Sequence, residues 1–234
     1  MTSPSLQTIL HDRVDAGRGL VEPLLKYAKR ADVIVLALPR GGVPVAYEVA
    51  TALEVRLELM LVRKLGVPTH QEFAMGAIAS GGIQIVNEDA LRANGIDQRT
   101  LDAVVAKETQ ELLRREQLYR ASRAPVALKD QVVILIDDGL ATGATMMAAI
   151  QAVRLQAPSR IVVAVPVAPV ETAEALRDEV DELICPLIPD WMISIGHWYT
   201  DFSQTSDKEV IDLLHRAWQR ESGSGDSFQN GSGI

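Results

Sequence analysis

Residues 132–145 read VVILIDDGLATGAT, and this stretch decides the fold. Five apolar residues without a polar interruption, at 132–136, are typical of a strand buried on both faces of a parallel sheet. The carboxylates of Asp137 and Asp138 follow at once, and after them come a loop of small residues and a helical pattern from residue 146. This order places charge at the carboxyl end of a strand, where open α/β sheets bind their ligands.

The loop after the acids has the features of a phosphate site. The start of a helix offers free N–H groups and the positive end of the helix dipole, and both attract a phosphate. Gly143 and Ala144 let the backbone come close to an anion, while Thr142 and Thr145 add hydroxyl donors. An ordinary strand-to-helix turn with capping side chains is the alternative, but a cap needs only one such residue.

The two acids point to a second part of the same ligand. Carboxylates repel a phosphate, so Asp137 and Asp138 are expected to accept hydrogen bonds from vicinal hydroxyls, directly or through a metal ion. A ligand with a phosphate at one end and a diol a few ångströms away is a ribose 5-phosphate.

This segment resembles the signature of the type I phosphoribosyltransferases, in which two acids flanked by apolar residues precede a Thr-Gly-x-Thr loop. In that family the acids hold the ribose hydroxyls of phosphoribosyl pyrophosphate (PRPP) and the loop holds its 5′-phosphate. The resemblance implies that Asp137 and Asp138 bind the ribose and its Mg²⁺ and take part in catalysis. It assigns the 5′-phosphate to Ala141, Thr142, Gly143, Ala144 and Thr145.

A second strand–loop–helix unit lies earlier in the chain. Residues 33–38 read VIVLAL, and Pro39, Arg40, Gly41 and Gly42 separate them from a helical pattern. The arginine supplies a fixed positive fork and the glycines let backbone N–H groups approach a diphosphate. Turns commonly use Pro and Gly, so this loop alone is weak evidence. Its position resembles the pyrophosphate loop of the transferase family, which assigns Arg40, Gly41 and Gly42 to pyrophosphate.

Further charged residues follow the next predicted strand, at 57–62. Arg63 and Lys64 come directly after it and either contact pyrophosphate or are solvated charges at a strand end. The polar segment THQEF follows at 69–73. In the family the loop near this point is mobile and closes over the reactants, and Glu72 is the candidate for a catalytic carboxylate on it, with His70 a lesser one.

Residues 66–125 predict an insertion between core strands, because they are longer than a normal connection. Two short apolar runs around Ser80 predict a hairpin. Asn87 or Asp89 is expected to cap a helix, and residues 98–122 predict a long charged helix. The arginines of that helix, Arg114, Arg115 and Arg120, either face water or reach the site.

Residues 189–202 concentrate aromatic side chains, with four of the ten Phe, Trp and Tyr residues of the chain. Flat aromatic faces can stack on a planar heterocycle. The transferase family builds its acceptor pocket from a late hood segment, and by this resemblance Trp191, Trp198 and Tyr199 are candidates for binding the acceptor. The alternative is a small aromatic core under a loop.

Composition restricts the setting of the protein. The 234 residues carry a formal net charge of −8, with a pI near 5.1, which disfavours general binding to nucleic acid or to anionic membranes. A single cysteine, Cys185, excludes an intrachain disulfide. No apolar stretch reaches the length of a membrane span and the first residues lack signal-peptide features, so a cytoplasmic location is expected.

Strands that alternate with helices predict an open parallel sheet covered by helices on both faces. The predicted class is α/β, of the type I phosphoribosyltransferase kind, with a small hood and an insertion subdomain. One domain is expected over residues 1–220, with the hood at about 187–205. The Gly/Ser-rich residues 221–234 are expected to form a disordered tail.

The resemblance implies transfer of a 5-phosphoribosyl group from PRPP, with Mg²⁺, to a nitrogen nucleophile such as a nucleobase, and a homodimer. Ala141 stands where the 6-oxopurine branch carries a carboxylate, so the loop is more similar to the adenine-transferring branch. The whole chain resembles bacterial phosphoribosyltransferases of unassigned acceptor. A regulator that binds PRPP without transferring it, and a diphosphotransferase that makes PRPP from ATP, are alternatives. Neither a helix-turn-helix with a basic face nor a P-loop is apparent in the sequence.

Overall fold

The computed structural model describes residues 9–68, 70–121 and 123–225. Its body is a five-stranded sheet in the order β2-β1-β6-β7-β8, and every neighbouring pair is parallel. The strands are β1 (Val33–Ala37), β2 (Arg56–Leu59), β6 (Val132–Ile136), β7 (Arg160–Ala164) and β8 (Glu182–Ile184). The predicted open α/β sheet is confirmed.

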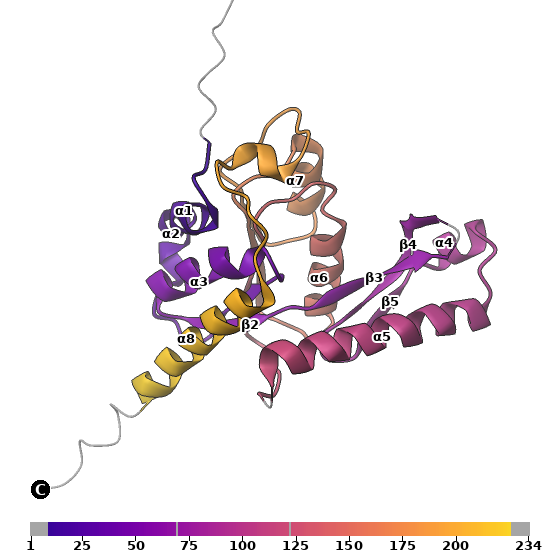
Figure 1. Cartoon of the computed structure of the whole chain (residues 1–234), viewed down its shortest axis with the longest axis horizontal. Helices are drawn as coiled ribbons and strands as arrows, with labels where there is room; N and C mark the ends of the chain where they lie inside the picture. Colours follow the sequence, from indigo (N-terminus) through magenta and orange to yellow (C-terminus); the bar gives the residue numbers. More distant parts are fainter. Residues whose placement is uncertain (1–8, 69, 122, 226–234) are drawn as a thin grey trace, which may run out of the picture.

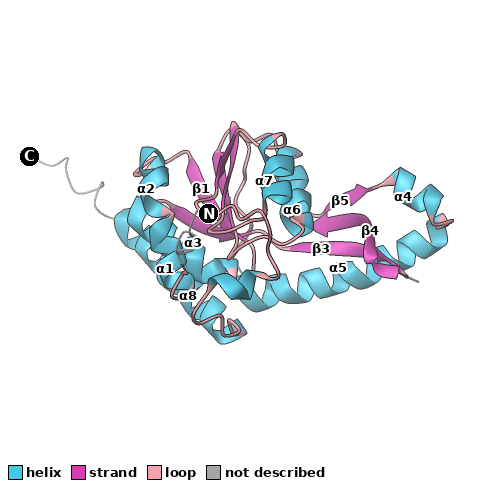
Figure 2. Cartoon of the chain, turned by 90° about the horizontal axis from the view of Figure 1, so that it is seen from above, coloured by secondary structure: helices cyan, strands magenta, loops and turns pink. Residues whose placement is uncertain are grey.

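The central strands are buried on both faces because their side chains alternate between two cores. In β6, Val132, Ile134 and Ile136 belong to one cluster, and Val133 and Leu135 belong to the other. Helices α1 (Arg13–Gly19), α3 (Gly42–Leu53) and α8 (Asp207–Gly225) cover the first cluster, and α6 (Ala144–Arg154) and α7 (Val170–Arg177) cover the second (Figure 2). An unbroken apolar run is therefore required, since every residue of the strand fills one core or the other.

The insertion forms a separate three-stranded antiparallel sheet in the order β3-β4-β5. Its elements are β3 (Val62–Val67), β4 (His70–Ala79), β5 (Ile83–Val86), α4 (Glu88–Ala93) and α5 (Gln98–Arg120). This sheet extends away from the body with α5 alongside it (Figure 1). The predicted hairpin is β4–β5, and the Asn87 side chain caps α4 by accepting from the Ala90 N–H at 2.9 Å.

The strand predicted at 57–62 is confirmed only up to Leu59, where β2 ends, because the chain changes sheets after that residue. The Met60 N–H still donates to the Ala37 carbonyl of β1, at 2.9 Å, whereas the Leu61 carbonyl accepts from the Ser80 N–H after β4, also at 2.9 Å. Both residues are 2% exposed, so the sequence stays apolar across the change. Arg63 consequently lies inside β3, as does Lys64, and not at the end of a core strand.

The C-terminal helix continues beyond its predicted end. A disordered tail is expected from residue 221 onward, but α8 runs to Gly225. Glu221 attaches this part of the helix to the body: its Oε1 accepts from the Leu57 N–H at 3.2 Å and its Oε2 accepts from Arg123 Nη2 at 2.7 Å. The rest of the predicted tail, residues 226–234, lies outside the described part of the chain.

Short helices complete the N-terminal region. After α1 ends at Gly19, α2 (Val21–Leu24) and the 3-10 helix η1 (Leu25–Tyr27) follow. Among the helices of the described residues, none combines the length and the apolarity needed to cross a membrane.

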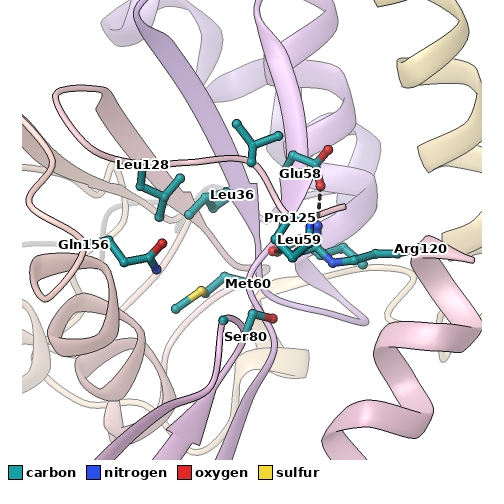
Figure 3. A pocket seen from close by; sticks show the side chains of 11 residues that line it. Leu36, Glu58, Leu59, Met60, Ser80, Arg120, Pro125, Leu128 and Gln156 are labelled. Carbon is teal, nitrogen blue, oxygen red and sulfur yellow. Dashed lines mark hydrogen bonds and ion pairs between the residues drawn. The ribbon is translucent and has the colours of Figure 1, made fainter. Parts of the chain in front are cut away.

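A buried ion pair fixes α5 to the body. Arg120, the last residue of α5, donates through Nη1 to Glu58 Oε2 at 2.6 Å and through Nη2 to the Leu59 carbonyl (Figure 3). Glu58 is 1% exposed and Arg120 is 5% exposed, and Arg123 donates to the second oxygen of Glu58 at 2.8 Å. The cavity beside this pair measures about 30 Å³. It admits a single water-sized molecule and no substrate.

We expect Arg120→Met to lower the free energy of unfolding by about 3–5 kcal/mol, because it removes one partner of a buried carboxylate. For a chain of this size the melting temperature should fall by roughly 6–20 °C in calorimetry. Arg154→Met is the matched control. Arg154 also binds one carboxylate and one carbonyl, both of Glu179, but its side chain is 51% exposed. Its replacement should cost at most about 1 kcal/mol, and equal losses in the two variants would contradict the role of burial.

Candidate active site

The two loops predicted to bind ligand are in direct contact at the carboxyl edge of the sheet. A Cβ atom at Gly41 would lie 1.9 Å from Asp138 Oδ2. A Cβ atom at Gly42 would lie 2.7 Å from the Ile136 carbonyl oxygen and 2.9 Å from Asp137 Cα. No larger side chain fits at either glycine, so the backbone of the Arg40–Gly42 loop lies directly against the two acids.

Asp138 is paired with an arginine from the N-terminal helix. Arg13 Nε donates to Asp138 Oδ2 at 2.7 Å, and both side chains are close to one-tenth exposed. The same guanidinium lies 4.0 Å from the centre of the Phe202 ring and donates through Nη1 to the Ser203 carbonyl at 2.6 Å. The hood segment is thereby attached to the second acid through a nearly buried ion pair.

Asp137 has a different electrostatic environment. Burial, and after it the negative charge of Asp138, raise the pKa of Asp137 well above its usual range. Its Oδ1 accepts from the Asp138 backbone N–H at 2.8 Å. The pair therefore combines one carboxyl group with a raised pKa and one that is paired with Arg13.

The loop predicted to bind the 5′-phosphate leads into α6. Gly143 is the N-cap, with φ at +70°, and a Cβ atom there would lie 2.7 Å from Thr172 Cγ2. The Thr172 hydroxyl of α7 donates to the Ala141 carbonyl at 2.6 Å, which holds the loop in place. The side chains of Ala141, Thr142, Ala144 and Thr145 are exposed. The first N–H groups of α6 have no partner within the helix and are available to an anion.

Arg40 extends toward the start of α8. Its Nη1 lies 3.6 Å from Asp207 Oδ1, and the hydroxyl of Tyr119 on α5 donates to the same oxygen at 2.6 Å. Burial, and after it the hydrogen bond to Asp207, raise the pKa of Tyr119 to about 12. The guanidinium of Arg40 is about one-third exposed, so it remains accessible to a ligand beside the loop.

The two basic residues of β3 have separate surroundings. Arg63 Nε donates to Glu108 Oε2 of α5 at 2.8 Å, and its side chain borders a small hollow beside Pro39 and Thr145. Lys64 lines a groove of about 600 Å³ between β3 and the first turns of α6. Arg63 is thus close to both ligand loops although its predicted position at a strand end was wrong.

The loop expected at 69–73 is different in the structure, because β4 already begins at His70. The side chain of Glu72 lies outside the described part of the chain. Its predicted catalytic role stays a prediction.

The aromatic residues of the hood divide into two groups. Trp198 is 8% exposed and Tyr199 is 6% exposed, and both pack into the core, which is the alternative that the sequence left open. The Tyr199 hydroxyl donates to the Asp138 carbonyl at 2.6 Å, so this residue holds the acid turn. Stacking on an acceptor by these two rings is not compatible with their burial. Trp191 is 74% exposed and precedes the 3-10 helix η2 (Ile195–Trp198).

Sequence reasoning missed three residues that hold the site: Arg13, Thr172 and Asp207. Each lies far along the chain from its partner, and the Arg13–Asp138 pair is separated by 125 positions. No local motif marks any of them. Asp207 lies in the first turn of α8, where the helix dipole already accounts for an acid, so its position gives no sign of a contact with Arg40.

Comparison with known proteins identifies the family. The model of the phosphoribosyl transferase domain matches residues 6–200. Two Mycobacterium tuberculosis proteins, from strains CDC 1551 / Oshkosh and ATCC 25618 / H37Rv and provisionally named phosphoribosyl transferases, are each 42% identical over 209 residues. This match covers 89% of the chain but 47% of each relative, so the chain spans about half their length.

A solved structure has the same fold. The crystal structure of TT1426 from Thermus thermophilus is 40% identical, has a TM-score of 0.80, and the match covers 89% of this chain and 98% of that chain. The parallel sheet, the acid pair and the helix-start loop all lie within the residues that the domain model matches. The chain belongs to the phosphoribosyl transferase domain family.

The raised pKa of Asp137 predicts a pH-dependent effect of Asp137→Asn. The folded protein holds this proton more tightly than the unfolded chain. The stability that Asp137 contributes is therefore present below its pKa in the unfolded chain, roughly 3.9, and is lost as the pH rises through its raised pKa in the folded protein. Asparagine does not ionise, so the variant should melt higher than the native protein at pH 7 and at nearly the same temperature near pH 4.

Scanning calorimetry across this pH range measures the difference. Asp138→Asn is the control with the opposite sign, because it breaks the ion pair with Arg13 and should lower the melting temperature at pH 7. A gap between the native protein and Asp137→Asn that stays constant with pH would contradict the assignment.

Proposed function

We propose that the domain transfers the 5-phosphoribosyl group of PRPP to a nitrogen nucleophile and releases pyrophosphate. The observation that supports this most is the contact of Gly41 and Gly42 with the turn that carries Asp137 and Asp138. A single ligand with a diphosphate next to a diol can bridge both loops only if they adjoin. PRPP carries its diphosphate on C1, beside the two ribose hydroxyls.

Each part of PRPP has a matching group in this site. The N–H groups at the start of α6 and the hydroxyls of Thr142 and Thr145 suit the 5′-phosphate. Free oxygens of Asp137 and Asp138 suit the ribose hydroxyls. The Arg40 guanidinium and the backbone N–H groups after it suit the pyrophosphate.

The donor set also fits Mg²⁺, which prefers oxygen ligands and is usually held by one or two carboxylates together with substrate phosphates. Asp138 Oδ2 is engaged by Arg13, so the remaining carboxylate oxygens of Asp137 and Asp138 are the ones that would face the ion. When bound, Mg²⁺ would neutralise charge on the departing pyrophosphate.

The chain's own contribution to the reaction is positioning and electrostatic stabilisation. Displacement at C1 develops positive charge on the ribose, which the oxygens of Asp138, and of Asp137 once it is ionised, would stabilise. Arg13 and the Tyr199 hydroxyl hold Asp138 in one orientation, so little reorganisation is needed when the charge develops. Arg40 stabilises the negative charge that accumulates on the leaving group.

For the acceptor we propose a planar nitrogen heterocycle. Trp191 supports this, because it presents an exposed indole on the hood segment that Tyr199 and Arg13 attach to the acid turn. Ala141 leaves the phosphate loop without a carboxylate, which favours an acceptor of the adenine type over a 6-oxopurine.

Ligand-linked stabilisation tests the PRPP site without knowledge of the acceptor. A ligand at about 100 times its dissociation constant adds about 2.7 kcal/mol to the free energy of unfolding. At roughly 2–4 °C for each kcal/mol, PRPP with Mg²⁺ should raise the melting temperature by roughly 5–11 °C. Ribose 5-phosphate should give a smaller shift because it lacks the diphosphate. No shift with PRPP at millimolar concentration, or a larger one with ATP, would refute the proposal.

Pyrophosphate release with a panel of nucleobases tests the transfer itself. A base-dependent release shows transfer, whereas PRPP binding without release from any base would indicate a PRPP-binding regulator. Release of AMP from ATP with ribose 5-phosphate would instead indicate a diphosphotransferase.

We expect Trp191→Ala to raise the KM for the acceptor by roughly 5- to 150-fold, since stacking of an aromatic side chain on a base is worth about 1–3 kcal/mol. The KM for PRPP should stay unchanged. Trp191→Phe keeps an aromatic face and should retain most of the affinity. Steady-state kinetics with both substrates varied measures the two constants, and an equal effect on both would contradict a stacking role.

A further inference from the structure

The long helix of the insertion turns a charged face toward the ligand loops. Glu108, Glu111, Arg115 and Tyr119 follow one another at spacings of three or four residues, so they lie on one side of α5. Glu108 binds Arg63 and Tyr119 binds Asp207, the residue paired with Arg40. Two of these four residues, Glu108 and Tyr119, therefore already bind residues beside the ligand loops.

Arg115 lies between them and reaches the junction of the two loops. Arg115 borders the same hollow, of about 20 Å³, as Pro39, Arg63 and Thr145, and the other residues that line it are apolar, so the hollow shows that these residues are neighbours and is not itself an anion site. Pro39 begins the glycine loop and Thr145 belongs to the phosphate loop. Arg63 and Arg115 are each about one-third exposed, so two guanidiniums from different elements border this hollow.

Arg115 keeps N–H donors for a ligand although it has an acidic partner. Its Nε donates to Glu111 Oε1 at 2.8 Å, and Arg114 Nε donates to the other oxygen of Glu111 at 2.7 Å. Hydrogen bonds from Arg114 and Arg115 lower the pKa of Glu111 to about 2, so this carboxylate is ionised at neutral pH. Two arginines therefore share this one carboxylate, and the bond to Glu111 uses one of the five N–H donors of Arg115.

The helix that carries Arg115 is rigidly placed. Arg120 is buried with Glu58 just over one turn further along, and Tyr119 is bound to Asp207. A guanidinium on such a support loses little freedom when it binds an anion.

We propose that Arg115 is a pyrophosphate-binding residue of this site, which makes the inserted helix part of the ligand-binding machinery. The inference rests on the proposed function. A diphosphate carries more negative charge than a single phosphate ester, and Arg40, Arg63 and Arg115 each keep N–H donors beyond those used on their acidic partners, so the third guanidinium adds to the neutralisation.

Isothermal titration calorimetry of the full chain with magnesium pyrophosphate, PRPP and ribose 5-phosphate tests the inference. Arg115→Gln should weaken pyrophosphate and PRPP binding by roughly 10- to 100-fold, the effect of one charged hydrogen bond. Binding of ribose 5-phosphate should change by less than about twofold, because the 5′-phosphate lies at the start of α6.

Two further variants control for structure. Arg114→Gln removes a neighbouring arginine that shares Glu111 but is 60% exposed, so pyrophosphate and PRPP affinity should fall far less than with Arg115→Gln, because an exposed charge is screened by solvent and salt. Glu111→Gln removes no cation and releases Arg115, so pyrophosphate should bind roughly two- to fivefold more tightly, as expected from the loss of a partly exposed ion pair. This increase cannot come from unfolding, and it keeps the test decisive if Arg115→Gln folds poorly.

The possible results separate the two proposals. If the native chain binds pyrophosphate and PRPP, and Arg115→Gln binds them equally well, the role of Arg115 is refuted and the proposed function stands. An equal loss for all three ligands would show that Arg115 is structural. If the native chain binds neither PRPP nor pyrophosphate, both the proposed function and the role of Arg115 are refuted.

Discussion

The site depends on one close contact, the packing of the glycine loop against the turn that carries the acid pair. Neither Gly41 nor Gly42 has space for a Cβ atom, because Asp138 and the backbone around Asp137 occupy it. This contact fixes the distance between the ligand group that the loop N–H donors would bind and the ligand group that the carboxylates would bind. The contact also brings cations and carboxylates together, so their charges must be compensated by the residues around them.

The surrounding elements compensate the charge of the acid pair. Arg13 neutralises Asp138, while desolvation and the charge of its neighbour raise the pKa of Asp137. A buried and a half-buried carboxyl group side by side destabilise the fold unless a ligand or a proton compensates them, which is the pattern of a site kept for function and not for stability. Tyr199 and Arg13 join the hood to Asp138, so a displacement of the hood would also disturb the surroundings of this acid.

The sequence pattern predicted the features that depend on residues close together in the chain. The run before Asp137 indicated a strand buried on both faces, and the alternation of strands and helices indicated the parallel sheet. What the sequence could not show depends on tertiary contacts: the pairing of Arg13 with Asp138 across 125 positions, and the burial of Trp198 and Tyr199. From the sequence alone, an aromatic residue that packs in the core cannot be distinguished from one that stacks on a ligand. The change of sheet at Met60 was hidden because both sheets bury that segment.

The same physics would allow an acidic chain to bind the highly charged anion that we propose as its ligand. Each arginine near the loop junction has an acidic partner: Asp207 for Arg40, Glu108 for Arg63 and Glu111 for Arg115. These acids hold the guanidiniums in place and reduce the repulsion between them while no anion is bound. The acids leave N–H donors free for a ligand, since each guanidinium has five of these donors and a carboxylate accepts from only one or two of them. Binding a diphosphate therefore competes with partly exposed ion pairs that are individually weak, so the acids orient the cations at a small cost in affinity.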